Sequence, residues 1–455
     1  MCGIAGAAGN VSRESVKKML HAIRHRGPDS SGISSICDVT LGSVLLKITG
    51  YKTQPLTHRE CALTYNGEIY NFREIARKLN IETDSDSEAL FSLIRSKGVE
   101  GAIPELDGDY AFAYVENDTL YLARDPAGVK PLYFCYADTE FFFASEKKAL
   151  SALDLDLTAI QALLPGYMLS FRKGAGTLKK VSGFTAGERI ADEDIAKEAL
   201  LGVIEKAVEK RRFQPSAIAF SGGLDSSIIA ALSSDSELYS VGMPGSHDIK
   251  QTKKAAQLLG LSDKLHLHEL TFEELEAAIP EVIRAVGSTD PMTVGIALPL
   301  FFTSRDAHRD GIRVMLSGQG ADELFAGYRR YESMEPDELE AALRKDLDNI
   351  AGHNLERDDA VTMANSVELR VPFLDRDVVG IVLGIAPELK IRNGIRKYIL
   401  RRAAEAILPD ELVWKEKKAA QYSSGIYSAL SKLARKKGYR GEGFLEKYLN
   451  QLEKN

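Results

Sequence analysis

The sequence predicts two domains of different fold class, an α+β domain over residues 1–185 and an α/β domain over residues 186–455. The first domain carries many short alternating or aromatic-rich segments, which are typical of antiparallel strands. From residue 216 onward, strand-like segments alternate with helical ones, which is the order of a parallel, doubly wound sheet. A chain of 455 residues is also too long for one ordinary core.

Short strand-like segments dominate the first domain, namely LGSVLLKI, CALTY, DYAFAYV, TLYLAR, LYFCY, EFFFAS and YMLSF. Two helical segments, residues 12–26 and 85–97, interrupt them. The second helical segment begins with two N-cap candidates, Ser85 and Ser87. Its apolar residues share one face: Leu90, Leu93 and Ile94.

The composition changes at residues 174–194, which are glycine-rich and charged and are expected to begin as a hairpin or linker. Residues 192–212 then predict an amphipathic helix. The side chains expected along its apolar side are Ile195, Leu200, Ile204 and Val208. Strand-like segments follow with helices between them, namely SAIAF, ELYSVGM, KLHLHEL and RVMLS, and the sequence beyond about residue 330 is mainly helical.

The overall composition is that of a globular protein, with 44% apolar and 27% charged residues. No segment reaches the roughly 18–20 apolar residues of a membrane span, and the N-terminus lacks the features of a signal peptide. A cytoplasmic location without a membrane partner is therefore expected. The net charge of −7 argues against a nucleic-acid partner, and the basic run RKKGYR is interpreted as a solvated surface.

Most cysteines and histidines of the chain do not indicate a site. The four cysteines contain no CxxC pair and are too few for a disulfide framework in so long a chain. Cys61 and Cys135 lie in apolar or aromatic segments and are expected to be buried. His266 and His268 share one strand face, but two ligands without a third do not make a zinc site.

Cys2 differs because of its position. Removal of the initiator methionine would leave Cys2 with a free α-amine, whose pKa of about 7.7–8.0 in peptides lets it accept the thiol proton at neutral pH. Nucleophile and base would then belong to one residue. A cysteine at position 2 is by itself weak evidence for a catalytic nucleophile, so the assignment depends on the motifs that surround it.

The motifs that follow Cys2 resemble, in order and spacing, the glutaminase domain of N-terminal-nucleophile amidotransferases, and most closely the asparagine synthetase branch. They are MCGIAG, RHRGPDSSG, QPL, NGEIYN, SDSE, RDPAGVKPLY and FASEKKAL, which together cover nearly the whole first domain. The resemblance implies an N-terminal-nucleophile hydrolase fold, in which antiparallel sheets lie between helices, with Cys2 as the nucleophile.

The resemblance also implies roles for other residues. Attack on the glutamine amide creates a negative oxygen that needs hydrogen-bond donors fixed in advance, here the Asn66 side chain and the Gly67 backbone N–H. Asn66-Gly67 is also typical of a type I′ hairpin turn, which is compatible with that role. Asp86 is implied to bind the α-ammonium group of glutamine, and Glu68 and Arg26 to orient the glutamine site.

Leu45 marks a departure from the family pattern. The family carries an arginine in the strand before the QPL motif, where it binds the α-carboxylate of glutamine, and Leu45 takes that place here. Lys47 lies two residues further on the same strand face, so it is the candidate substitute.

Residues 216–227, SAIAFSGGLDSS, predict a strand, a glycine-rich turn and the start of a helix. Glycines let backbone N–H groups approach phosphate oxygens, and the N-terminus of a helix favours negative charge. The motif lacks the Gly-Lys-Ser/Thr ending of a Walker loop and resembles the PP-loop of enzymes that split ATP into AMP and pyrophosphate. The ATP-binding residues that it implies are Ser221, Gly222, Gly223, Asp225, Ser226 and Ser227.

LSGQGADELFAGY, residues 316–328, resembles the adenylate and magnesium segment of the same family. Asp322 is implied to hold Mg²⁺ together with Asp225, because this ion prefers carboxylate and phosphate oxygens. The residues implied to approach the adenylate are Ser317 and Gly318. The family has an acidic residue where this chain has Gln319, which can form hydrogen bonds but carries no charge.

SVELRVPFLD and RNGIRKYILR complete the pattern. Lys397 aligns with the lysine that neutralises phosphate charge as the acyl-adenylate forms. Val241 and Met243, at the end of the second strand of this domain, are expected beside the adenine. Arg370 and Asp375 are interpreted either as organisers of the pocket or as members of structural salt bridges.

Together the motifs predict an enzyme that activates aspartate with Mg-ATP as β-aspartyl-AMP and amidates it with ammonia that Cys2 releases from glutamine. The ammonia is expected to pass internally, because water would protonate it. The expected partners are glutamine, aspartate and ATP, and a homodimer is expected because dimers are common in the family.

Alternatives remain open. A related amidotransferase would amidate another carboxylate. A β-lactam synthetase is disfavoured because it does not use a glutaminase site, which this chain retains. An amidophosphoribosyltransferase is disfavoured because it needs a phosphoribosyl-pyrophosphate site, whereas this chain carries the PP-loop SGGLDSS. A non-catalytic ATP-binding subunit is disfavoured because Cys2, Asp225, Asp322 and Lys397 are all present.

Overall fold

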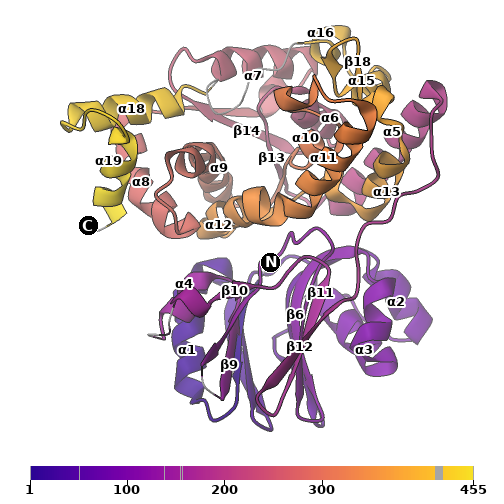
Figure 1. Cartoon of the computed structure of the whole chain (residues 1–455), viewed down its shortest axis with the longest axis vertical. Helices are drawn as coiled ribbons and strands as arrows, with labels where there is room; N and C mark the ends of the chain where they lie inside the picture. The colour runs from indigo at the N-terminus through magenta and orange to yellow at the C-terminus, as the bar shows by residue number, and fades with distance from the viewer. Residues whose placement is uncertain are drawn as a thin grey trace. The chain divides into compact units, whose positions relative to one another are not determined.

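The computed structural model describes residues 2–50, 52–137, 139–153, 155, 157–415 and 424–453. The chain divides into two compact units, Met1–Phe184 and Thr185–Asn455. Figure 1 shows the first unit in indigo to magenta and the second in magenta to yellow.

Antiparallel sheets form the centre of the first unit. Among its described residues, one six-stranded sheet has the order β10 (Gln161–Ala162), β8 (Tyr133–Ala137), β9 (Glu140–Ala144), β1 (Cys2–Ala8), β3 (Val39–Leu45) and β2 (Ser30–Ile36). The other has the order β12 (Ala175–Lys180), β11 (Tyr167–Arg172), β7 (Thr119–Arg124), β6 (Gly108–Glu116), β5 (Cys61–Ile69) and β4 (Leu56–His58). Apolar side chains from both sheets, such as Ile4 and Leu41 from one and Ala113 and Leu122 from the other, form a common core.

Helices cover the outer faces of these sheets, as Figure 1 shows. α1 (Arg13–Ala22) and α4 (Lys147–Ser151) pack on the sheet that contains β1, and α2 (Phe72–Leu79) and α3 (Asp86–Ala102) pack on the sheet that contains β5. The predicted sandwich of antiparallel sheets between helices is therefore confirmed. Ser85 is the N-cap of α3, and the apolar residues predicted on one face of this helix are buried.

Asn66 and Gly67 do not form a hairpin turn, so this prediction from the sequence is wrong. Both lie inside β5, where they pair with Ala111 and Tyr110 of β6. Long-range strand pairing on this buried ladder overrides the local turn preference of the dipeptide.

The second unit is built on a parallel sheet. Its strand order in the described part of the chain is β15 (Leu265–Glu269), β14 (Glu237–Gly242), β13 (Ala217–Ala219), β16 (Val314–Leu316) and β17 (Glu368–Arg370). The chain winds outward from β13 to one edge and then from β16 to the other, so the predicted doubly wound topology is confirmed. β17 was not expected from the sequence, because three residues within SVELRVPFLD are too few to show a strand pattern.

Helices surround this sheet and make up most of the chain beyond residue 330. Their bounds are α5 (Glu193–Arg211), α6 (Leu224–Leu232), α7 (His247–Leu258), α8 (Phe272–Val286), α9 (Pro291–Arg309), α10 (Ala321–Leu324), α11 (Pro336–Ile350), α12 (Glu356–Ala364), α13 (Arg376–Gly384), α14 (Pro387–Lys390), α15 (Tyr398–Ala404), α16 (Asp410–Val413), α18 (Ile426–Lys436) and α19 (Phe444–Glu453).

Helix α5 corrects one predicted core residue. Leu200, Ile204 and Val208 are buried as expected, but Ile195 is 61% exposed and Ala196 is buried in its stead. Residues on one helix face are three or four positions apart, so Ala196 aligns with Leu200 and Ile195 does not.

None of the single helices within the described residues is long and apolar enough to cross a membrane. The pair α8 and α9 reaches the required length only in combination, across a bend of 107°.

Candidate active sites

Cys2 is the first residue of β1 and has a fixed place in the sheet. It pairs with Leu45 of β3, and its backbone nitrogen donates a hydrogen bond to Asn66 Oδ1 at 3.1 Å. Asn66 is fully buried, and its Nδ2 has no hydrogen-bond partner among the described residues. A buried amide donor without a partner costs free energy unless a ligand accepts its hydrogen bond. Asn66 is therefore prepared to donate to an oxygen atom next to Cys2.

Gly67 follows Asn66 and lines the same small cavity as Cys2. A Cβ at this position would lie 2.2 Å from the carbonyl oxygen of Asp109, so only glycine fits between the paired strands. The close approach fixes the backbone on which the second predicted oxyanion donor lies.

Arg26 and Glu146 hold the carbonyl group of Cys2 in place. Arg26 Nε donates to the Cys2 carbonyl oxygen at 3.2 Å, and its Nη1 donates to Glu146 Oε1 at 2.9 Å. Burial acts to raise the pKa of Glu146, but the hydrogen bond to His25 and the charge of Arg26 outweigh it and hold that pKa well below its usual range. Glu146 was not singled out in the sequence, although an acidic residue two positions after the buried strand β9 was an available signal.

Asp86 and Glu68 place two buried carboxyl groups in the wall of the cavity. Asp86 accepts hydrogen bonds from Tyr65 Oη at 2.8 Å, from the Ile69 backbone N–H at 3.2 Å and from that of Ser87 at 2.7 Å. Burial and the charge of Glu68 nevertheless raise the pKa of Asp86 to about 8. A cationic group bound here would stabilise the ionised form of Asp86.

Leu45 lies where the resemblance places an arginine, at the end of β3 and in the wall of the cavity. Lys47 lies beyond the end of this strand, so the prediction that it shares a strand face with Leu45 is wrong. The cavity has a volume of about 30 Å³, and the basic residues in the described part of its lining are Lys47 and Lys52. Asp29 Oδ2 accepts a hydrogen bond from the Lys47 backbone N–H at 2.8 Å, and Lys52 Nζ lies 3.3 Å from Glu88. Lys52 is therefore a second candidate to replace the arginine, and the sequence did not single it out.

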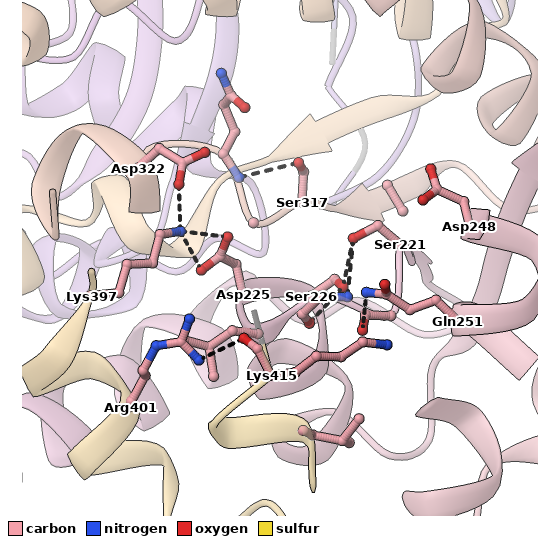
Figure 2. Close-up of a pocket in the computed structure, with 17 residues that line it drawn as sticks. Ser221, Asp225, Ser226, Asp248, Gln251, Ser317, Asp322, Lys397, Arg401 and Lys415 are labelled. Atoms are coloured by element: carbon pink, nitrogen blue, oxygen red, sulfur yellow. Dashed lines mark hydrogen bonds and ion pairs between the residues drawn. The ribbon is translucent and has the colours of Figure 1, made fainter. Parts of the chain in front are cut away.

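The PP-loop follows β13 at the point where the strand order of the parallel sheet reverses. Ligands of such sheets bind outside the carboxyl ends of the strands at this switch point. Gly222 has a φ of +66°, and its carbonyl oxygen accepts a hydrogen bond from Gln251 Nε2 at 2.8 Å. α6 then begins at the loop, so its N-terminus points toward the same crevice. Figure 2 shows this loop with Ser221, Asp225 and Ser226 in the wall of a pocket.

The loop after β16 faces the PP-loop from the neighbouring strand. A Cβ at Gly318 would lie 2.8 Å from Asp225 Cβ, so the glycine permits a close approach of the two loops. Gly327 leaves room for Asp322 and Lys397, because a Cβ there would lie 1.9 Å from Asp322 Oδ1 and 2.5 Å from Lys397 Cε. These glycines explain why both signatures bring their aspartates into one pocket.

Lys397 joins the two aspartates, as Figure 2 shows. Its Nζ donates to both carboxylate oxygens of Asp225 at 2.7 Å and lies 2.6 Å from Asp322 Oδ1. Burial acts to lower the pKa of Lys397, but the two carboxylates outweigh it and the pKa is raised. Lys397 also has a φ of +55°, a strained backbone conformation of the kind that collects at functional sites.

Two neighbouring cavities make up this site. The first, of about 290 Å³, has a wall formed by both loops, Lys397, Asp248, Gln251, Arg401 and Lys415. The second, of about 310 Å³, shares Ser221, Ser317, Gln319 and Asp322 with the first and extends to Val241. Asp248, Gln251 and Lys415 were not expected from the sequence, since they lie outside the recognised motifs, and Arg401 ends the motif RNGIRKYILR but was not singled out.

Several predicted residues lie outside these walls. Ser227 is fully buried in α6, and Met243 packs beside residues 424 and 425 and forms a backbone hydrogen bond with Ser424. Arg370 is buried and pairs with Glu368, while Asp375 caps α13 and pairs with Arg211 and Lys210. This geometry favours the structural interpretation of Arg370 and Asp375.

The paired histidines and the cysteines outside the site behave as ordinary residues. His266 contacts Glu237 at 2.8 Å, and His268 contacts Asp306 at 2.7 Å. Within the described residues, no group of three or more histidine, cysteine or acidic side chains is arranged to hold a metal ion. Cys61 and Cys135 are buried, as expected.

Comparison with known proteins matches the two units to two families. A glutamine amidotransferase domain matches residues 1–199, and an asparagine synthase domain matches residues 199–341 and 332–449. The chain is 35% identical to a provisionally named asparagine synthetase (glutamine-hydrolyzing) 1 of Methanocaldococcus jannaschii, over 100% of this chain and 99% of that protein. The chain belongs to the glutamine-hydrolysing asparagine synthetase family.

Other members of the family are more distant. The chain is 30% identical to asparagine synthetase (glutamine-hydrolyzing) 2 of Arabidopsis thaliana and 31% identical to asparagine synthetase (glutamine-hydrolyzing) 1 of Lotus japonicus, over 94% of this chain and 79% and 78% of those proteins. A solved glutamine phosphoribosylpyrophosphate amidotransferase of B. subtilis is 18% identical over 59% of this chain and 65% of that chain, with a TM-score of 0.37, which is too low to bear on function. As a family member, the chain is a carbon–nitrogen ligase that takes nitrogen from glutamine and uses ATP.

Proposed function

We propose that this enzyme converts aspartate to asparagine through β-aspartyl-AMP. The side-chain carboxylate of aspartate attacks the α-phosphorus of ATP, and pyrophosphate leaves. Cys2 attacks the side-chain amide of glutamine, which gives a glutamyl thioester and ammonia. Ammonia then displaces AMP from the aspartyl group to give asparagine, and water hydrolyses the thioester to glutamate.

The arrangement around Cys2 supports the first half of this proposal. The unpaired Nδ2 of Asn66 and the backbone N–H of Gly67 are the proposed oxyanion donors. Asp86 and Glu68 are the proposed partners of the glutamine α-ammonium group, because they supply buried carboxyl groups in the wall of the cavity. Lys47 and Lys52 are the proposed partners of the α-carboxylate, because they are the basic residues in the described part of the cavity wall.

The crevice between the PP-loop and the loop after β16 supports the second half. We assign the phosphates to Ser221, Gly222, Gly223, Ser226 and the N-terminus of α6, and the adenylate to Ser317 and Gly318. The adenine is assigned to the part of the larger cavity that Val241 lines. Ser227 and Met243 would support these walls from behind, since neither lines a cavity.

Asp225 and Asp322 fit a magnesium ion. Their oxygens converge on one Lys397 ammonium group beside the proposed phosphate site, and oxygen donors are those that Mg²⁺ prefers. The ion would balance the charge of ATP when bound there. Lys397 would then be released toward the α-phosphate, where charge builds as pyrophosphate leaves.

The observation that carries the proposal is the contact of Lys397 with both aspartates at the switch point of the sheet. The test is to incubate the protein with Mg-ATP, with and without aspartate, and to measure pyrophosphate. We expect aspartate-dependent release of pyrophosphate, followed by asparagine when glutamine or ammonia is added. Release that needs another carboxylate would favour a related amidotransferase, and no release with any acceptor would contradict adenylation.

A further inference from the structure

The larger cavity of the second unit has a charged wall that the ATP site does not use. Arg357 and Asp358, at the start of α12, line this cavity together with Ser317 and Asp322. Arg357 is the one cationic side chain in the described part of this lining. The cavity thus links the proposed phosphate site to a fixed positive charge.

Arg357 is held in place, and part of its guanidinium group remains available. Its Nε donates to Asp358 Oδ1 at 2.8 Å, its Nη2 lies 2.7 Å from the same oxygen, and its Nη1 donates to the His353 carbonyl oxygen at 3.3 Å. A guanidinium group has five N–H donors, so at least one N–H on each terminal nitrogen remains. No acceptor for this pair lies among the described residues, and such a pair is the fork that binds a carboxylate through two hydrogen bonds.

Asp358 offers the opposite charge next to this fork. Only Oδ1 of its carboxyl group takes part in the hydrogen bonds with Arg357, and Oδ2 accepts none from the described residues. The residue is 5% exposed, and burial raises its pKa. A buried carboxylate with a free oxygen is stabilised by a cationic ligand in the cavity.

Two other polar side chains of this wall, those of Tyr328 and Asn354, are already engaged. Tyr328 Oη and Asn354 Nδ2 both donate to Glu323, at 2.5 and 2.8 Å. The unsatisfied polar atoms of Arg357 and Asp358 therefore form a pair of opposite charge, which matches the carboxylate and ammonium groups of an α-amino acid.

We propose that Arg357 and Asp358 select the acceptor by its head group, with Arg357 binding the α-carboxylate and Asp358 the α-ammonium group. This inference rests on the proposed function, in which the acceptor is aspartate. The side-chain carboxylate of aspartate then extends toward Asp322 and the phosphates. A dicarboxylate without an amino group, or an amino acid without the α-carboxylate, loses one half of this recognition.

The test compares three acceptors in pyrophosphate release at saturating Mg-ATP: L-aspartate, β-alanine, which lacks the α-carboxylate, and succinate, which lacks the α-ammonium group. Each analogue is also measured as a competitive inhibitor of the reaction with aspartate, so that a poor acceptor still reports its affinity. The variants are Arg357→Gln, Arg357→Lys and Asp358→Asn. Arg309→Gln on the exposed surface of α9 is the matched control.

Arg357→Gln should lower kcat/KM for aspartate roughly ten- to a hundredfold and leave the constants for β-alanine unchanged. Asp358→Asn should lower kcat/KM for aspartate by a similar factor and leave succinate unchanged. Arg357→Lys should recover part of the loss, because it keeps the charge without the fork. The control variant should keep the kinetic constants of the unaltered enzyme, and the KM for ATP should stay the same in every variant.

Equal losses for all three acceptors would show that the pair is only structural and would overturn the inference. Unchanged constants for aspartate in both variants would also overturn it, while leaving the proposed function intact. Absence of aspartate-dependent pyrophosphate release by the unaltered enzyme would instead contradict the proposed function itself.

Discussion

The two sites are constructed in different ways. In the first unit, sheet pairing itself sets the positions of the reacting groups, since Cys2 and Asn66 lie on strands β1 and β5 and the cavity beside them is about 30 Å³. In the second unit, loops at strand ends surround cavities of about 290 and 310 Å³. There the charged groups neutralise one another through Lys397.

This difference suits the two chemistries that we propose. Covalent attack by a thiol needs donors fixed at one developing oxygen, which a rigid sheet provides. Adenylation needs a cavity large enough for a nucleotide. It also needs charged side chains that pair with each other in the free enzyme and with the phosphates or a metal ion once ATP is bound. The comparison predicts that changes in the first site affect synthesis with glutamine alone, whereas changes in the second affect synthesis with both nitrogen donors.

Removal of the nucleophile should give the largest difference. Cys2→Ala is expected to lower glutamine-dependent synthesis by several orders of magnitude, because no other group forms the thioester. Synthesis with ammonia should remain close to that of the unaltered enzyme. Asparagine formation is measured with each donor at saturating aspartate and ATP, and an equal loss with both donors would refute the separation of the two sites.

Changes at the second site should be smaller but should affect both donors. Lys397→Ala and Asp225→Asn each remove charge that balances the phosphates, so pyrophosphate release should fall roughly 10²–10³-fold. Glutamine hydrolysis without ATP should continue. The control is Lys254→Ala, which removes an exposed lysine paired with Glu411. Normal pyrophosphate release in both variants would mean that the adenylation site lies elsewhere.

Leu45 offers a change that should improve the first site. Leu45→Arg would restore a charge-assisted contact with the α-carboxylate and lower the KM for glutamine roughly ten- to a hundredfold, with little effect on the rate with ammonia. Lys47→Ala and Lys52→Ala should each raise the KM for glutamine when introduced alone. They should have no effect on this KM when combined with Leu45→Arg. A glutamine KM that is low from the start and insensitive to both lysine changes would contradict this account.

Asp86 predicts a pH dependence confined to glutamine. With a pKa of about 8, the free site is mostly protonated at pH 7, and only the carboxylate binds an ammonium group. The Kd for glutamine should therefore fall about tenfold from pH 6 to 7 and about fivefold from pH 7 to 8, and then level off. Calorimetry on Cys2→Ala measures this without turnover. Glu68→Gln should shift the transition to lower pH, and a Kd independent of pH would disprove the assignment.

The sequence predicted those features that local patterns encode. The glycine-rich PP-loop, the alternation of strands and helices and the Ser85 N-cap are each carried by neighbouring residues. The prediction of a turn at Asn66-Gly67 was wrong because these residues pair with β6, and pairing between distant strands cannot be seen in a local pattern. Glu146 and the pair Arg357–Asp358 were missed for a similar reason. Their significance depends on partners or a cavity that only the fold brings together, and ERDD alone is typical of a solvated helix face.

The central claim is that the side chain of aspartate is activated as an adenylate, and the fate of its oxygen tests this most directly. Aspartate labelled with oxygen-18 in the side-chain carboxylate is converted with Mg-ATP and glutamine, and the products are analysed by mass spectrometry. When ammonia displaces AMP, one labelled oxygen leaves with the nucleotide, so we predict label in AMP and none in inorganic phosphate. Label in inorganic phosphate, with ADP as the nucleotide product, would contradict the account.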